Sequence, residues 1–171
     1  EEVMKEHPAN LEKYINDMVD LHLTVHSKVT PKLSKLKDKL ARQINSLDTI
    51  SDVVKYELLT RLESMPKHTK LCHGNFIPAN IILNEKGTFI VDWVAARQGN
   101  ASADVARTYL LFSLNNPDAA ELYMNAFCKK TNTSKKYVQE WLPIVAAAQL
   151  TEGKPEQKDF LMKWIDVVAY E

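Results

Sequence analysis

The sequence predicts a mainly α single domain that is interrupted once by a small β-hairpin. Apolar residues recur at three- and four-residue steps along most of the chain, which is the period of an amphipathic helix. Short apolar stretches bounded by turn residues are confined to the middle of the chain, at residues 70–91. A length of 171 residues suits one domain with a substantial core, so we expect residues 1–171 to form a single unit.

Three helices are expected in the first third of the chain. The first covers residues 11–26, where one face carries Leu11, Tyr14, Ile15, Met18, Val19, His22, Val25 and His26. The second follows Pro31, and its apolar face carries Leu33, Leu36, Leu40 and Ile44. The third begins after a cap supplied by Asp48 or Ser51 and ends at Pro66.

The middle of the chain predicts strands at residues 70–72, 81–83 and 88–91, the last two joined into a hairpin by a turn at residues 84–87. Helices return from residue 102 onward, with expected ranges of about 103–115, 117–130, 134–150 and 155–170. Polar loops flank the hairpin on both sides. Because binding residues gather on loops held by a rigid scaffold, we expect the functional site there.

Charge and cysteine content exclude several classes of partner. Lys plus Arg and Asp plus Glu are each 22, so no overall field attracts nucleic acid or a membrane surface, and a small-molecule partner is expected. Cys72 and Cys128 lie far apart without a CxxC spacing, which favours a reducing compartment over a disulfide framework. No apolar run is long enough to span a bilayer, so the sequence predicts a cytoplasmic protein.

The strongest motif lies in residues 72–107. It reads Cys-His-Gly-Asn-Phe-Ile-Pro-Ala-Asn-Ile-Ile-Leu at 72–83, Phe-Ile-Val-Asp-Trp at 89–93, and Gly-Asn-Ala-Ser-Ala-Asp-Val-Ala-Arg at 99–107. This pattern resembles the phosphotransferase family of aminoglycoside and choline kinases, in which His-Gly-Asp, four residues and Asn precede an apolar strand that ends in Asp. The resemblance covers about residues 15–150 and implies the helical C-terminal lobe of a protein-kinase-like fold.

The resemblance implies a role for each residue of the motif. Asn80 and Asp92 would hold Mg²⁺ for ATP, as a loop Asn and a second Asp do in protein kinases. Asn75 would stand at the catalytic-base position, and His73 would be a scaffold of the loop. Asp104 would cap a helix and tie the loop down. Asn80 and Asp92 alone could be ordinary turn and hairpin-end residues, but their joint spacing beside His73 favours a site.

Two positions depart from the family pattern. Asn75 replaces the family's Asp, and Ile77 replaces a common His. An amide cannot accept the proton of the acceptor hydroxyl, and a positioned general base is worth roughly 10²–10⁴ in rate. Phosphoryl transfer nonetheless depends mainly on positioning and charge stabilisation. The change at Asn75 is therefore expected to impair turnover more than binding.

The resemblance also implies an N-terminal lobe with a sheet, a phosphate-covering loop and a lysine that pairs with nucleotide phosphates. No run of strands is predicted before residue 70, so we expect this lobe to be absent and the chain alone to be inactive. A fragment, a natural truncation and one piece of a split enzyme all stay open, as do the acceptor and the oligomeric state.

Three functions follow from these observations. The first is a lobe of an ATP-dependent phosphotransferase that acts on a hydroxyl of a small polar molecule such as an aminoglycoside, choline or a sugar-like acceptor. The second is a pseudokinase or small-molecule-binding module without transfer, which Asn75 favours. The third is a helical interaction domain in which the motif is accidental.

Three further features have ordinary explanations. His22 and His26 have a spacing that zinc could use, but no third ligand is near in sequence, so packed or capping histidines are expected. The basic residues of 28–42 alternate with leucines, as on a solvated helix face. Trp141, Trp164 and Tyr170 are expected to pack among the last helices, although the family binds its acceptor among such helices.

Overall fold

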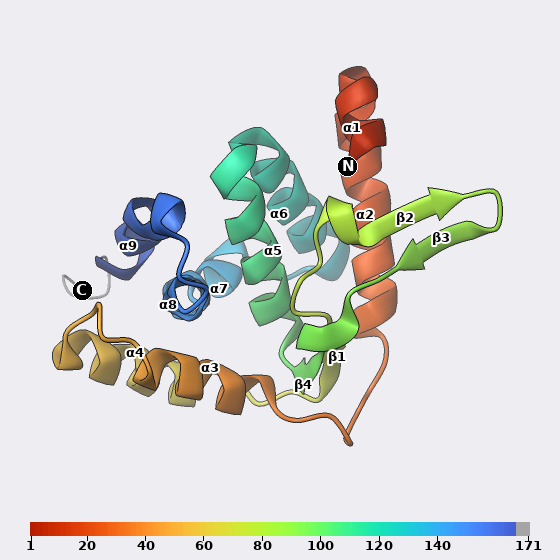
Figure 1. Ribbon diagram of the computed structural model, residues 1–171. Coiled ribbons are helices and arrows are strands. Elements are labelled where there is room, and N and C mark those ends of the chain that lie inside the picture. Colours follow the sequence, from red (N-terminus) through yellow and green to blue (C-terminus); the bar gives the residue numbers. More distant parts are fainter. Residues whose placement is uncertain (167–171) are drawn as a thin grey trace.

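The computed structural model describes residues 1–166, and Figure 1 shows that helices dominate it. The helices are α1 (Glu2–Glu6), α2 (Leu11–His26), α3 (Leu36–Asn45), α4 (Asp52–Ser64), α5 (Ala101–Asn115), α6 (Pro117–Thr131), α7 (Lys135–Gln139), α8 (Leu142–Leu150) and α9 (Lys158–Asp166). The strands are β1 (Lys70–Cys72), β2 (Ile81–Asn84), β3 (Gly87–Ile90) and β4 (Arg97–Gly99). The predicted mainly α fold with a small hairpin is confirmed.

Local signals placed several helices correctly. Helix α2 has the predicted bounds, because its apolar face supplies the buried Ile15, Met18 and Val19. Ser51, rather than Asp48, caps α4 by accepting a hydrogen bond from the Val54 N–H at 3.3 Å. Helix α4 then ends before Pro66, whose ring disfavours a helical conformation in the residue before it.

Three predicted helices differ from the structure. The second begins at Leu36 rather than Leu33, because the segment before it is extended and Lys35 bridges to Gln98 of β4. The range 134–150 holds two helices, α7 and α8, because Pro143 lacks an N–H and fits only the first turn of a new helix. The range 155–170 starts with a 3₁₀ turn before α9, and its end, including Tyr170, lies outside the described residues.

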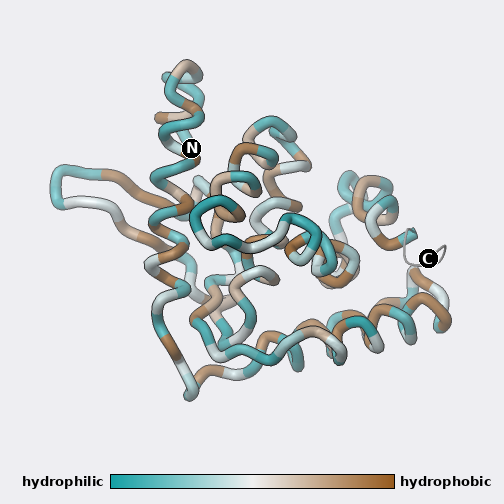
Figure 2. The backbone as a smooth tube through the Cα atoms, turned by 180° about the vertical axis from the view of Figure 1, so that it is seen from behind, coloured by the Kyte–Doolittle hydropathy of each residue, from teal (hydrophilic) through white to brown (hydrophobic). Residues whose placement is uncertain are grey.

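Two small antiparallel sheets flank the site. Strand β1 pairs with β4, with Lys70 opposite Gly99, and β4 was not predicted. Strands β2 and β3 form the predicted hairpin, with Ile81 opposite Ile90 and Asn84 opposite Gly87. Figure 1 shows this hairpin projecting from the helical body, and its tip is hydrophilic in Figure 2. Residues 80 and 92 therefore lie at the base of the hairpin, where it joins the helical body.

The core joins the helices into one hydrophobic cluster around α5, which contacts α6, α7 and α8. Trp141 is fully buried and Trp164 packs against the cluster, so the expected packing role of both is confirmed. Cys72 and Cys128 are free thiols. None of the helices within residues 1–166 combines the length and apolar composition that spanning a bilayer requires.

Candidate active site

The loop at residues 73–77 leaves β1 and crosses the N-terminal part of α5. Gly74 adopts a left-handed conformation with φ of +82°, and a Cβ there would lie 2.7 Å from the Ala95 carbonyl oxygen. Only glycine combines that backbone conformation with so close an approach. Gly74 therefore lets the loop pack directly against the 3₁₀ turn Trp93–Ala95 that follows Asp92.

Asp104, in the first turn of α5, anchors this loop from the protein interior. Its Oδ2 accepts hydrogen bonds from the His73 N–H at 2.7 Å, His22 Nε2 at 2.8 Å and His26 Nε2 at 3.0 Å. Its Oδ1 accepts the Gly74 N–H at 2.8 Å. Four N–H groups thus point at one carboxylate that is only 2% exposed. The protein itself satisfies this carboxylate.

The charge state of this cluster follows from its partners. Burial opposes ionisation, but the contacts with His22 and His26 outweigh it and hold the pKa of Asp104 well below its usual range. The two backbone N–H donors act in the same direction, because they favour the charged form. Burial lowers the pKa of His22 to about 4, with the nearby His26 as a further cause. At neutral pH the arrangement is an ionised Asp104 beside a neutral His22.

The neutral His22 has a defined tautomer. Its Nε2–H donates to Asp104, and its Nδ1 accepts from the Tyr123 hydroxyl. Burial raises the pKa of Tyr123 well above its ordinary value, so this hydroxyl keeps its proton and acts as the donor. Phe76 of the loop stacks on the His22 ring with centroids 3.9 Å apart. Helix α2 therefore supports both the loop and its anchor.

Two further side chains of α5 hold the loop. Arg107 Nε donates to the Gly74 carbonyl at 2.5 Å, and Thr108 Oγ1 donates to the Phe76 carbonyl at 2.8 Å. Residues three and four positions after Asp104 share its face of the helix. Asp104, Arg107 and Thr108 therefore all bind the loop from one face of α5.

His73 serves as a scaffold inside the loop. It is fully buried, its Nδ1 accepts the Asn75 N–H at 3.1 Å, and its Nε2 lies 2.9 Å from the Val91 carbonyl. A carbonyl only accepts, so Nε2 carries the proton and donates to Val91. One ring therefore ties the position of Asn75 to the strand end that leads to Asp92.

The open edge of the loop brings Asn75, Asn80 and Asp92 together. Asn75 Nδ2 donates to Asp92 Oδ2 at 2.7 Å, and Asn80 Nδ2 lies 3.4 Å from the same oxygen. Asn80 Nδ2 also donates to the Asn75 carbonyl at 2.8 Å, which fixes its amide orientation. Asp92 is exposed and has a left-handed backbone with φ of 60°.

The donor set at this edge fits a hard divalent cation such as Mg²⁺. Within residues 1–166, neither Asn80 Oδ1 nor Asp92 Oδ1 has a hydrogen-bond partner. An amide oxygen and a carboxylate oxygen are ligands that Mg²⁺ accepts together with phosphate oxygens and water. The residues present can therefore hold the ion, with most of its coordination left to other ligands.

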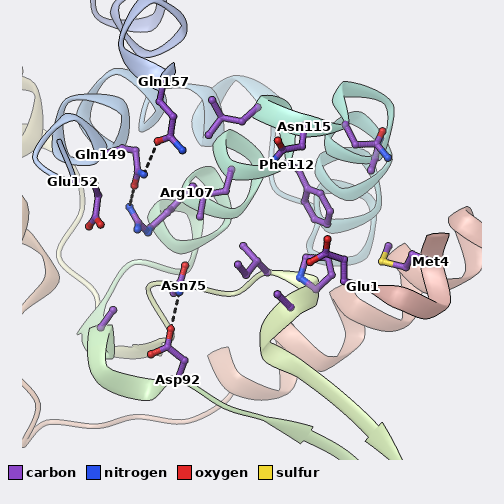
Figure 3. A pocket seen from close by; sticks show the side chains of 18 of the residues that line it. Glu1, Met4, Asn75, Asp92, Arg107, Phe112, Asn115, Gln149, Glu152 and Gln157 are labelled. Carbon is purple, nitrogen blue, oxygen red and sulfur yellow. Dashed lines mark hydrogen bonds between the residues drawn. The ribbon is translucent and has the colours of Figure 1, made fainter. Parts of the chain in front are cut away.

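A cavity of about 1000 Å³ opens beside Asn75 (Figure 3). Its lining comes from the N-terminal segment up to Leu11, from the loop and the turn after Asp92, and from α5 and the segments around α8 and α9. Figure 3 labels ten of the lining residues: Glu1, Met4, Asn75, Asp92, Arg107, Phe112, Asn115, Gln149, Glu152 and Gln157. Ile77, where the family commonly has His, also lines the cavity.

The structure corrects the expected cap. Asn100 caps α5 by accepting the Ser102 N–H at 2.9 Å, whereas Asp104 lies in the first turn and does only the expected tying of the loop. His22 and His26 are packed, not capping. Asp104 is the third ligand-type group that the local sequence did not offer, and the three ligand atoms lie within 4.8 Å of one another. Hydrogen bonds from both rings to Asp104 already account for this cluster.

Sequence reasoning missed Lys39, Arg107 and Gln149. The spacing of Arg107 from Asp104 was a usable signal, because it places both on one face of a helix. Arg107 Nη1 donates to Gln149 Oε1 at 2.7 Å across 42 positions of sequence, and no local pattern announces that contact. Among the basic residues of 28–42, Lys32, Lys35 and Arg42 are exposed as expected, but Lys37 and Lys39 are half-buried, and Lys39 lines the cavity.

Comparisons with known proteins show the family and the fold of the chain. Residues 4–160 match the phosphotransferase enzyme family. The fold is similar to choline kinase LicA from Streptococcus pneumoniae, with a TM-score of 0.69 and 12% identity over 95% of this chain and 65% of that chain. It is also similar to LicA in complex with AMP, with a TM-score of 0.67 and 13% identity over 95% and 62%. The chain therefore spans less than two thirds of either LicA chain. No curated protein is similar enough in sequence to count as a relative.

Proposed function

The chain belongs to the phosphotransferase enzyme family, and we propose that it is the catalytic-loop and acceptor-binding lobe of an ATP-dependent kinase acting on a hydroxyl group of a small polar molecule. One observation carries the proposal. Asn75, Asn80 and Asp92 converge at the rim of a large cavity, on a loop that Asp104 fixes from below. Residues that arrive from separate strands and turns meet there, as a phosphoryl-transfer site requires.

Each residue has a distinct part in the proposed reaction. Asn80 and Asp92 would hold Mg²⁺, which neutralises charge on the phosphates of a nucleotide. Asn75 Nδ2 is committed to Asp92, so Asn75 Oδ1 is the end that can accept a hydrogen bond from the acceptor hydroxyl. That contact orients the hydroxyl but cannot remove its proton. We therefore expect slow transfer in a well-ordered site.

Nucleotide binding is proposed to need a strand-rich lobe. Strands β1–β4, the strands within residues 1–166, form two separate two-stranded sheets and cover no phosphate site. The hairpin and the turn after it expose Ile82, Leu83, Phe89 and Val94, apolar side chains of a kind that a second lobe would cover. Without such a lobe we expect no transfer by this chain. A cytoplasmic location, where ATP is available, and a small-molecule partner belong to the same proposal.

The runner-up is a binding module without transfer activity. It is favoured by the 2.7 Å hydrogen bond from Asn75 to Asp92, in which an amide takes the place of a base and partly satisfies the metal-binding carboxylate. Such a protein keeps the cavity and the loop but does no chemistry. Turnover separates the two functions.

The test is a Mg²⁺- and ATP-dependent transfer assay on the chain assembled with a nucleotide lobe, joined or supplied in trans. Asn75→Asp supplies a proton acceptor and should raise the rate by roughly 10²–10⁴. Asp92→Asn should abolish transfer, whereas Asp48→Asn, the same change at an exposed position outside the site, should leave it unchanged. Brisk turnover by the parent that Asn75→Asp does not increase would show that residue 75 is not the base position.

A further inference from the structure

Beside the exposed Lys5 and Lys154, three half-buried cationic side chains line the same cavity without a carboxylate partner. They are Lys39 of α3, Arg97 of β4 and Arg107 of α5. Within residues 1–166, none of the three has an acidic oxygen within the 4.0 Å of an ion pair. The carboxylates that line the cavity, Glu1, Asp92 and Glu152, form no ion pair with these three cations, so the mutual repulsion of the cations favours an incoming anion.

Arg107 is positioned rather than neutralised. Its Nε donates to the Gly74 carbonyl at 2.5 Å and its Nη1 to Gln149 Oε1 at 2.7 Å, so both partners are neutral. Gln149 Nε2 in turn donates a hydrogen bond to Gln157 Oε1, and Gln157 is also uncharged. A guanidinium has five N–H donors, so this one keeps donors beyond those two contacts. The guanidinium is therefore held in place by neutral partners, and its remaining N–H groups are left for a ligand.

Lys39 and Arg97 reinforce the same region. Burial lowers the pKa of Lys39, and the positive charges of Arg107 and Arg97 lower it further. Arg97 donates through Nη1 to the Ala96 carbonyl at 2.6 Å, while its buried Nε has no partner. Glu152, which is exposed, and Asp104, whose oxygens already accept four N–H groups, offset part of this charge at longer range.

The cavity does not suit a quaternary ammonium. Such groups are recognised by cages of several aromatic rings. Among the described residues that line the cavity, Phe112 is the one aromatic side chain. LicA from Streptococcus pneumoniae, of similar fold, is a choline kinase by name, and choline is a cation. Cationic side chains outnumber acidic ones in the lining of this cavity, which disfavours a cationic ligand.

We infer that the acceptor of this chain carries an anionic oxygen group, a carboxylate or phosphate monoester, that binds at Lys39, Arg97 and Arg107. The inference rests on the proposed function, which supplies the reacting hydroxyl. Arg107 bonds to Gly74, the neighbour of Asn75, so the anionic group lies a few bonds from that hydroxyl. Figure 3 shows Asn75 between Arg107 and Asp92, so Arg107 lies on the side of Asn75 away from Asp92, the side left for the acceptor.

Two probes that share a hydroxyethyl chain and carry opposite charges test the sign of the ligand's charge. Choline and 3-hydroxypropionate both carry a hydroxyl on a two-carbon chain, ending in a trimethylammonium and a carboxylate respectively. Calorimetric titration of the 171-residue chain, without Mg²⁺ or nucleotide, should show binding of 3-hydroxypropionate and none of choline. Inorganic phosphate should compete with 3-hydroxypropionate for the same site.

Three variants connect binding to the cationic residues. Arg107→Gln and Lys39→Gln should each weaken 3-hydroxypropionate binding about tenfold or more, because each removes a charged contact. Within residues 1–166 the Lys39 ammonium has no hydrogen-bond partner, so Lys39→Gln keeps the test valid if Arg107→Gln fails to fold. Arg42→Gln, the matched change at an exposed position of α3, should have no effect.

Several outcomes would overturn the inference. These are binding of choline in place of the anion, anion binding that survives both cavity variants, and equal weakening by Arg42→Gln. Because these titrations omit metal and nucleotide, failure of the anion site leaves the roles of Asn80 and Asp92 untouched, and the transfer assay tests those separately.

Discussion

Two aspartates hold opposite sides of one loop, and their surroundings differ completely. Asp104 is buried and accepts four N–H groups, two from the backbone and two from histidines. Asp92 is exposed, and within residues 1–166 its side chain accepts hydrogen bonds only from the side-chain amides of Asn75 and Asn80. A carboxylate whose hydrogen-bonding capacity is filled by the protein serves structure. One that keeps a free oxygen at a cavity rim is available to a ligand.

The largest expected difference between the two is in stability. Asp104→Ala leaves four N–H groups unpaired in the interior and should lower the free energy of unfolding by about 3–5 kcal/mol. Asp92→Ala at the exposed position should change it by less than about 1 kcal/mol. Urea unfolding followed by circular dichroism measures both. Equal losses for the two variants would break the comparison.

The pH dependence of stability sharpens the buried side. His22 has an unfolded pKa near its ordinary 6.5 and a folded pKa of about 4. Below pH 6.5 the unfolded chain therefore takes up a proton that the folded chain does not, and stability falls as the pH drops toward 4. We expect a loss on the order of 2–3 kcal/mol over this window. The low pKa of Asp104 adds stability that is lost only at lower pH, below its unfolded value.

The check is a series of urea titrations between pH 7 and pH 4 on the parent and on His22→Gln. The variant has no group to protonate at this position, so its stability should depend less on pH across the window. A parent whose stability stays level between pH 6.5 and pH 4.5 would contradict the assignment of a neutral His22.

Gly74 lies in the loop between the buried anchor at Asp104 and the exposed edge at Asp92. In Gly74→Ala the new Cβ would lie 2.7 Å from the Ala95 carbonyl oxygen, so the turn after Asp92 must move. We expect a loss of about 1–3 kcal/mol beyond the cost of a left-handed alanine. Gly153→Ala is the matched control, because its φ is +65° but no atom lies within 4 Å of its Cβ. Thermal unfolding that gives equal losses for the two variants would contradict the close packing at Gly74.

Much of the fold could be predicted from local patterns. The apolar period of α2 and the cap at Ser51 are local features, and both were usable. Strand β4 has the sequence Arg-Gln-Gly, which offers no apolar alternation, and it exists because β1 pairs with it. The missing N–H of Pro143 could have indicated the break between α7 and α8, but the apolar run around it favoured the prediction of one continuous helix.

The site divides in the same way. The open edge could be predicted because Asn75, Asn80 and Asp92 belong to one short motif. The buried support of the site includes His22 of α2, which precedes its hydrogen-bond partner Asp104 by 82 positions in the sequence. The half-buried state of Lys39 also depends on tertiary packing, since Lys35 and Arg42, one helical turn before and after it, are exposed. Contacts across such separations leave no local pattern.

The central claim is that Asp92, and not Asp104, is the carboxylate open to a metal. The most direct measurement uses Mn²⁺, which takes the same oxygen ligands as Mg²⁺ and broadens nearby NMR signals. Titration of the ¹⁵N-labelled chain should broaden the side-chain amide signals of Asn75 and Asn80 first. Asp92→Ala should abolish the effect, and Asp48→Ala should not. Broadening centred on His22 and His26, or broadening of the Asn75 and Asn80 amides that persists in Asp92→Ala, would contradict the account.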